Sequence, residues 1–124
     1  MRFSLVLLYT VLIATLSLAH VPPPGDLPGW LGSLDKVAHF GMYGLYALIL
    51  MFWKARSQGE NRQGMILAVL WATFYGMLME ILQAMLPQQM RDFSWGDFAA
   101  NALGALAGVF VWRRTRFQRW AAAK

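Results

Sequence analysis

The sequence contains no cysteine, which excludes disulfide bonds and thiolate metal sites. It also has few charged residues, which make up 14% of the chain, against about 25% in soluble domains. Hydrophobic residues make up 58% of the 124 residues, which is more apolar surface than a water-soluble chain of this length can bury. A chain surrounded by lipid has no need to bury it. The composition therefore predicts a single membrane-embedded domain.

Four apolar stretches follow one another along the chain, at about 3–19, 38–53, 64–86 and 96–112. Each is near the length of about 17–25 residues that crosses a hydrocarbon core about 30 Å thick. Because lipid offers no hydrogen-bonding partners to backbone amides, stretches of this kind should be helices. The sequence predicts an all-α integral membrane protein, a small bundle of four transmembrane helices in one domain that spans residues 1–124.

The basic residues are unevenly distributed along the chain. Arg2 precedes the first apolar stretch, and the 54–63 loop and the 113–124 tail are basic, whereas the 20–37 and 87–95 loops carry little net charge. Lys and Arg accumulate on the cytoplasmic side of membrane proteins. We therefore expect both termini to be cytoplasmic. The basic tail should contact anionic lipid headgroups, and we expect no nucleic-acid partner.

The first apolar stretch has a second interpretation. Arg2, the apolar run and Ser17-Leu18-Ala19 resemble a signal peptide with a small-x-small cleavage site. Cleavage would leave three helices and an outside N-terminus, without changing the orientation of the other helices. The prolines at 22–24 predict an extended outer linker after this stretch.

Polar residues near the ends of the apolar stretches form three pairs. The members of each pair are three or four positions apart, so they share one helix face. Under the predicted topology, all three pairs lie at the outer end of the bundle and should form a polar pocket just below the membrane surface. The pairs are Asp35 and His39, Glu80 and Gln83, and Asp97 and Asn101.

The fourth stretch also carries a stripe of small residues. Asp97, Asn101, Gly104 and Gly108 recur at intervals of four, three and four, which keeps them on one helix face. The Gly104-x-x-x-Gly108 pattern allows two helices to approach closely. Because the polar residues share this stripe, we expect Asp97 and Asn101 to point into the bundle.

Two groups of residues in this region form motifs of defined order and spacing. They are Asp35-Lys36-x-x-His39-Phe40 with Tyr43, and Glu80-x-x-Gln83, Pro87 and Arg91 followed by Asp97-x-x-x-Asn101-x-x-Gly104-x-x-x-Gly108. Over residues 35–108 the sequence resembles the VanZ-like family of bacterial membrane proteins, whose two signatures follow this order. The family takes its name from a protein associated with resistance to the glycopeptide teicoplanin. The resemblance implies a cell-envelope protein of the bacterial cytoplasmic membrane and suggests glycopeptide resistance, but it implies no particular reaction.

The polar cluster has three alternative functions. In the first, an enzyme acts on a lipid or lipid-linked envelope substrate at the outer leaflet. His39, Glu80 and Asp97 are then the candidate general acids and bases. Lys36 and Arg91 would hold an anionic headgroup. Asp35, Gln83 and Asn101 would support the site.

In the second alternative, the cluster is a clamp whose members only hydrogen-bond the helices to one another. In the third, the pocket binds a lipid or glycopeptide without chemistry. A variant of the first makes Asp35, His39, Glu80 and Asp97 ligands of a divalent metal. Their spacing matches no established metal motif, so no metal site is assigned. The sequence does not decide whether the protein is an enzyme, nor its substrate and oligomeric state.

Overall fold

The computed structural model describes residues 2–19, 28–57, 61–86 and 92–122 and consists of four α-helices. They are α1 (Arg2–Leu18), α2 (Gly29–Ser57), α3 (Arg62–Met85) and α4 (Trp95–Ala122). The described residues include no β-strand, so the predicted all-α fold is confirmed. The prolines at 22–24, expected to form an outer linker, lie outside the described residues.

Two helices extend beyond the apolar stretches that predicted them. Helix α2 begins at Gly29 and ends at Ser57, although its apolar stretch covers only about 38–53. Helix α4 continues to Ala122, so the basic segment that follows residue 112 is helical as far as the structure describes it. Hydropathy reports the part of a helix that suits lipid. Beyond residue 112, α4 continues through Arg, Gln and Ala residues, which favour helical backbone.

Among the described residues, two helices are long and apolar enough to cross a membrane. They are the Ser33–Ala55 part of α2, with a mean hydropathy of 1.2, and α3, with a mean hydropathy of 1.9. Helix α1 is a shorter apolar helix of 17 residues. Large apolar side chains remain exposed on all four helices, among them Leu8, Val37, Phe74 and Phe110. These lengths and this apolar surface suit a protein surrounded by lipid.

Helices α2 and α4 form the closest helix pair of the bundle, and glycine residues lie where they contact each other. A Cβ atom at Gly104 would collide with the backbone carbonyl of Phe40, and one at Gly108 would collide with the carbonyl of Gly44. A Cβ atom at Gly44 would in turn lie 3.1 Å from the carbonyl oxygen of Gly104. The structure thus places both glycines of the small-residue pattern at a backbone-to-backbone contact, where no larger residue fits.

Helix α1 packs against α2 and α3 through hydrogen bonds as well as apolar contacts. The Tyr9 hydroxyl donates to the carbonyl oxygen of Met42 on α2 at 3.0 Å, and the Tyr75 hydroxyl of α3 donates to the carbonyl oxygen of Thr10 at 2.9 Å. The Thr10 hydroxyl lies 2.8 Å from the Tyr46 hydroxyl. These bonds give α1 a defined position in the fold.

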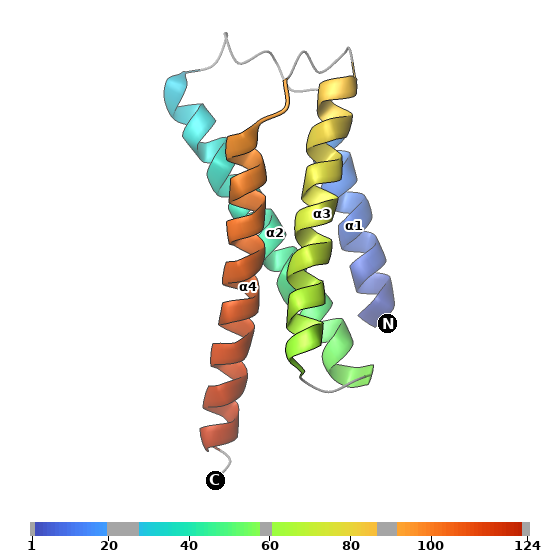
Figure 1. The fold of residues 1–124 in the computed structure, drawn as a ribbon, viewed down its shortest axis with the longest axis vertical. Helices are drawn as coiled ribbons and strands as arrows, with labels where there is room; N and C mark the ends of the chain where they lie inside the picture. Colours follow the sequence, from blue (N-terminus) through green and yellow to red (C-terminus); the bar gives the residue numbers. More distant parts are fainter. Residues whose placement is uncertain (1, 20–27, 58–60, 87–91, 123–124) are drawn as a thin grey trace.

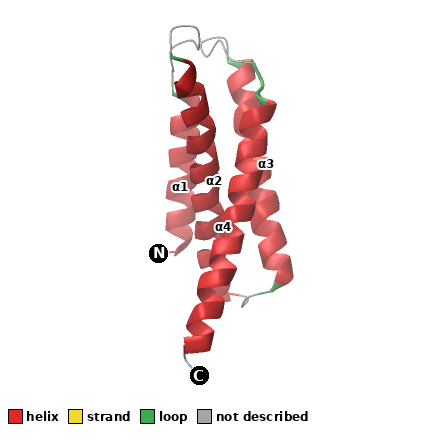
Figure 2. Ribbon diagram, turned by 90° about the vertical axis from the view of Figure 1, so that its left-hand side faces the viewer, coloured by secondary structure: helices red, strands yellow, loops and turns green. Residues whose placement is uncertain are grey.

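The helices run alternately up and down, so the bundle has two distinct ends (Figures 1 and 2). At one end, uppermost in Figure 1, α1 and α3 finish and α2 and α4 begin. Both termini lie toward the opposite end, where α4 extends beyond the other helices. We call these the polar end and the basic end, because Asp35, Glu80 and Asp97 lie toward the first and Arg62, Arg113 and Arg116 toward the second.

Candidate functional site

The polar end holds a cluster of buried polar side chains contributed by α2, α3 and α4. Five of them are at least nine-tenths buried although they are charged or strongly polar, and Asp35 is half-buried at the margin of the cluster. The sequence pattern explains the convergence, because α2 and α4 begin at this end and α3 finishes there. The five buried residues are His39, Glu80, Gln83, Asp97 and Asn101.

His39 lies at the centre of the cluster and faces groups from all three helices. Its Nδ1 atom lies 2.9 Å from Oδ1 of Asn101 on α4 and 3.8 Å from Oε1 of Glu80 on α3. Its Nε2 atom lies 3.8 Å from Oδ1 of Asp35, one turn earlier on α2. Because an amide oxygen only accepts hydrogen bonds, Nδ1 carries the ring proton in this arrangement. The Nε2 atom then faces Asp35.

Asp97 enters the cluster from the first turn of α4. The backbone N–H of Asp97 donates to the Ser94 hydroxyl at 3.2 Å, and the N–H of Phe98 donates to the Ser94 carbonyl at 3.0 Å, so Ser94 caps the helix. A carboxylate in the first helical turn is favoured by the helix dipole. The cap and the glycine contact further along α4 together fix the direction in which Asp97 points.

Three residues of the cluster are arranged as cation ligands could be. Asp35, His39 and Asp97 each offer one ligand atom, and these atoms all lie within 4.8 Å of one another. A ring nitrogen and carboxylate oxygens are ligands that many divalent ions accept. A metal-binding histidine usually donates its other ring N–H to an oxygen, as His39 does to Asn101. The arrangement can therefore bind a divalent cation or transfer protons through His39.

Gly76 on α3 makes room for the Asn101 side chain, and the sequence analysis did not identify it. A Cβ atom at Gly76 would lie 2.7 Å from Nδ2 of Asn101. The spacing does place Gly76 on the polar face of α3, because Gly76 precedes Glu80 by one helical turn. Only the placement of α4 against that face explains why the position has no side chain.

The remaining predicted site residues have different surroundings. The Gln83 amide donates to the backbone carbonyl of Ser17 at 2.5 Å, which ties α3 to α1. Lys36 is exposed and reaches across to the beginning of α4, where a Cβ atom at Gly96 would lie 2.9 Å from its Cε atom. Arg91 and Pro87 lie outside the described residues.

The fold and the comparisons with known proteins agree on the kind of protein. In the described part of the chain, an all-helical bundle with two helices long and apolar enough to cross a membrane, and with exposed apolar side chains, has the features of a helical membrane protein. The chain matches the VanZ/LLP1 family model over residues 2–117, and it belongs to this family. No curated protein and no solved structure matches the chain.

Proposed function

We propose that all four helices span the bacterial cytoplasmic membrane, with the basic end in the cytoplasm and the polar end near the outer leaflet. An even number of crossings requires both termini on one side, and both termini lie toward one end of the bundle (Figure 1). The basic residues Arg2, Arg62 and Arg113 belong to that end. The preference of Lys and Arg for the cytoplasmic side then sets the orientation.

At the polar end, His39 and the carboxyl groups around it form a site for a lipid or lipid-linked envelope substrate. The observation that supports this most strongly is the position of the buried imidazole, whose Nδ1 lies 3.8 Å from Glu80 and whose Nε2 lies 3.8 Å from Asp35. An imidazole can accept a proton on one nitrogen as it releases one from the other. His39 would therefore relay protons between buried Glu80 and half-exposed Asp35, and so act as a general acid or base.

A clamp between the helices explains this composition less well. Ionisable side chains within a membrane are costly, and they usually mark a site of function. A neutral amide can hydrogen-bond two helices together at a lower desolvation cost, as the bond from Gln83 to Ser17 illustrates. A clamp does not require a histidine and three carboxyl groups at one end of a bundle. Lys36, exposed at the same end, is placed to attract an anionic headgroup.

The experiment measures teicoplanin susceptibility of a sensitive Gram-positive host that expresses the wild-type protein or Glu80→Gln at matched membrane levels. Glutamine preserves size and hydrogen bonding but cannot ionise. Asp92→Asn is the matched control, because Asp92 is an exposed acid close to the same end. We expect protection by the wild type and the control, and loss of protection with Glu80→Gln.

Two other outcomes would count against the proposal. Equal protection by Glu80→Gln would favour the clamp, because a clamp needs the hydrogen bonds of residue 80 and not its charge. Absence of protection by the wild type would exclude a role in glycopeptide resistance in that host. Analysis of lipid extracts from the same strains then tests directly whether the site acts on lipid-linked substrates. If it does, the composition of the extracts should change only in strains whose protein retains Glu80.

A further inference from the structure

Three ionisable side chains at the polar end have the spacing that a metal ion requires. Asp35 and His39 lie one turn apart on the same face of α2, and Asp97 lies in the first turn of α4. One ligand atom of each residue lies within 4.8 Å of the other two. Two ligands of one zinc ion, at about 2.0–2.2 Å from it, lie at most about 4.4 Å apart. Side-chain shifts of less than about 1 Å would therefore bring all three atoms onto one ion.

The His39 ring has the orientation of a metal-binding histidine. Its Nδ1 atom lies 2.9 Å from the amide oxygen of Asn101. Its Nε2 atom faces Asp35 at 3.8 Å, which is longer than a hydrogen bond. Histidine ligands usually bind an ion through one ring nitrogen and donate the N–H of the other to an oxygen. Nε2 is therefore the atom that would bind the ion, and Asn101 holds the ring in position.

The two carboxyl groups differ in burial, and this gives the site a fixed part and a movable part. Asp97 is 4% exposed, and the Ser94 cap fixes its direction, whereas the Asp35 side chain is 36% exposed at the margin of the cluster. Both carboxyl groups also make other interactions. Binding an ion is compatible with these interactions, because a carboxylate has two oxygens and about four lone pairs. Asp35 can turn toward an ion that buried His39 and Asp97 already contact.

The combination of ligands selects among the divalent ions. Mg²⁺ and Ca²⁺ prefer oxygen ligands, whereas imidazole suits zinc and the neighbouring transition metals. Zn²⁺ also binds a given set of nitrogen and oxygen ligands more tightly than Mn²⁺ or Fe²⁺ does. Zinc sites with three protein ligands keep a further position for water or a substrate oxygen. One imidazole and two carboxylates therefore match Zn²⁺ best.

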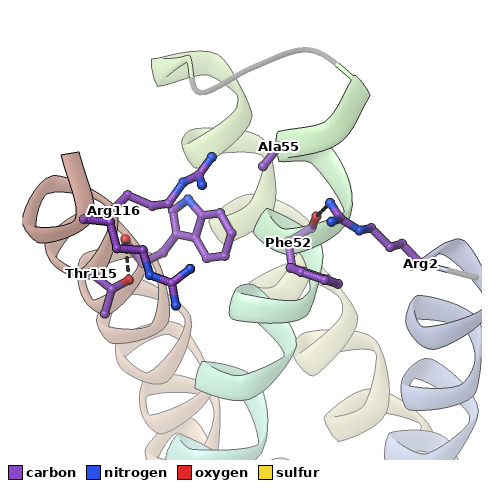
Figure 3. Close-up of a pocket in the computed structure, with 7 residues that line it drawn as sticks. Arg2, Phe52, Ala55, Thr115 and Arg116 are labelled. Atoms are coloured by element: carbon purple, nitrogen blue, oxygen red, sulfur yellow. Dashed lines mark hydrogen bonds between the residues drawn. The ribbon is translucent and has the colours of Figure 1, made fainter. Parts of the chain in front are cut away.

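The opposite end of the molecule offers no comparable set of ligands among the described residues. A cavity of about 400 Å³ lies there between α1, α2 and α4, and Figure 3 shows Arg2, Phe52 and Arg116 around it. None of the described residues that line it is an acid or a histidine. Because a guanidinium group is cationic and has no acceptor, this cavity should repel a metal ion. Zinc binding is therefore expected at the polar end alone.

We infer that Asp35, His39 and Asp97 form a zinc site with an open coordination position. Binding of the ion does not depend on the proposed function. Its consequence rests on that function, because a zinc ion on Nε2 leaves no lone pair there for a proton. His39 could then pass no proton to Asp35, so zinc would inhibit the proposed site.

The test measures binding of zinc chloride alone to the purified full-length protein in neutral detergent, by isothermal titration calorimetry. We expect one Zn²⁺ per chain, bound about tenfold or more tightly than Mg²⁺ or Ca²⁺. His39→Gln and Asp35→Asn should each weaken zinc binding about tenfold or more, because each variant removes one of three protein ligands. Co²⁺ bound in place of Zn²⁺ should give visible absorption bands, and His39→Gln should change them because a nitrogen ligand is lost.

His20→Gln is the matched control for His39→Gln, because His20 is the only other histidine of the chain. Asp92→Asn is the control for Asp35→Asn, because Asp92 is an exposed acid outside the group of three ligands. We expect both controls to bind zinc as the wild type does. Size-exclusion chromatography and circular dichroism confirm that each variant is folded, and Asp35→Asn, at a half-exposed position, serves if His39→Gln is not.

Three outcomes would overturn the inference. They are absence of zinc binding, equal weakening by His20→Gln and His39→Gln, and binding of Mg²⁺ as tight as that of Zn²⁺. Because the measurement contains neither lipid nor antibiotic, its result is independent of the teicoplanin experiment. Failure of the zinc site and failure of the proposed function can therefore be told apart.

Discussion

Asn101 determines the tautomer and the orientation of the His39 ring. Its amide oxygen holds the proton on Nδ1 and so turns Nε2 toward Asp35. The side chain of Asn101 is completely buried. Its position depends on Gly76, which leaves the space that the amide occupies. One glycine on α3 therefore controls the geometry of a histidine on α2 through an asparagine on α4.

Gly76→Ala should consequently disturb both the site and the stability of the bundle. The added methyl group would lie 2.7 Å from Nδ2 of Asn101, so the amide has to move or the helices have to separate. We expect the free energy of unfolding to fall by roughly 1–3 kcal/mol, the usual cost of overpacking. Thermal unfolding in detergent measures the effect.

Gly41→Ala is the control for this substitution, because a Cβ atom at Gly41 meets nothing within 4 Å. Alanine favours helical backbone over glycine by about 1 kcal/mol, so this variant should be as stable as the wild type or more so. A Gly76→Ala protein that is stabilised to the same extent would contradict the described packing between α3 and α4.

At the scale of helices, the contact between α2 and α4 is the most constrained part of the fold. The groups that a Cβ at Gly104 or Gly108 would meet are backbone carbonyls of α2, which cannot rotate away as a side chain can. The two helices would have to separate along their contact. The small-residue pattern therefore fixes the distance at which Asp97 and Asn101 face His39.

Gly104→Ala should be more destabilising than Gly76→Ala, because the first collides with backbone and the second with a side chain. We expect a loss of about 3 kcal/mol or more in the free energy of unfolding, at the upper end of overpacking effects. The same thermal unfolding series measures it, with Gly41→Ala again as the control. A smaller loss than that of Gly76→Ala would show that α2 and α4 lie further apart than described.

Spacing along single helices predicted much of this fold and site. The intervals between Asp35 and His39, between Asp97 and Asn101, and between Gly104 and Gly108 each define a helix face without reference to other helices. Contacts between helices could not be read in this way. Gln83 shares a face with Glu80, yet it bonds to α1, because the partner of a helix face depends on how the helices are arranged.

The first apolar stretch illustrates the same limit. Its sequence fits both a transmembrane helix and a signal peptide, because both are apolar runs that follow a basic residue. The difference lies in tertiary contacts. In the structure, Ile13 and Ser17 are buried, and the carbonyl oxygens of Thr10 and Ser17 accept hydrogen bonds from α3.

For the whole molecule, the separation of acidic and basic groups predicts how the bundle lies in the membrane. Because the chain lacks cysteine, single cysteines provide specific labelling sites. Ser33 is exposed at the polar end, and Gln63 is exposed at the basic end. A membrane-impermeant maleimide added to intact cells should label Ser33→Cys and should label Gln63→Cys only after the membrane is opened. Labelling of Gln63→Cys in intact cells would reverse the proposed orientation.

The stripe of Asp97, Asn101, Gly104 and Gly108 on α4 means that the site and the contact between α2 and α4 can only be conserved or lost together during evolution. Asp97 and Asn101 face His39 only while Gly104 and Gly108 face α2, since all four lie on the same side of one helix. An inserted or deleted residue between Asn101 and Gly104 would rotate one half against the other by about 100°. A descendant can therefore exchange most lipid-facing residues of α4 one at a time, whereas a change of its length between these positions removes the site and the packing in a single event.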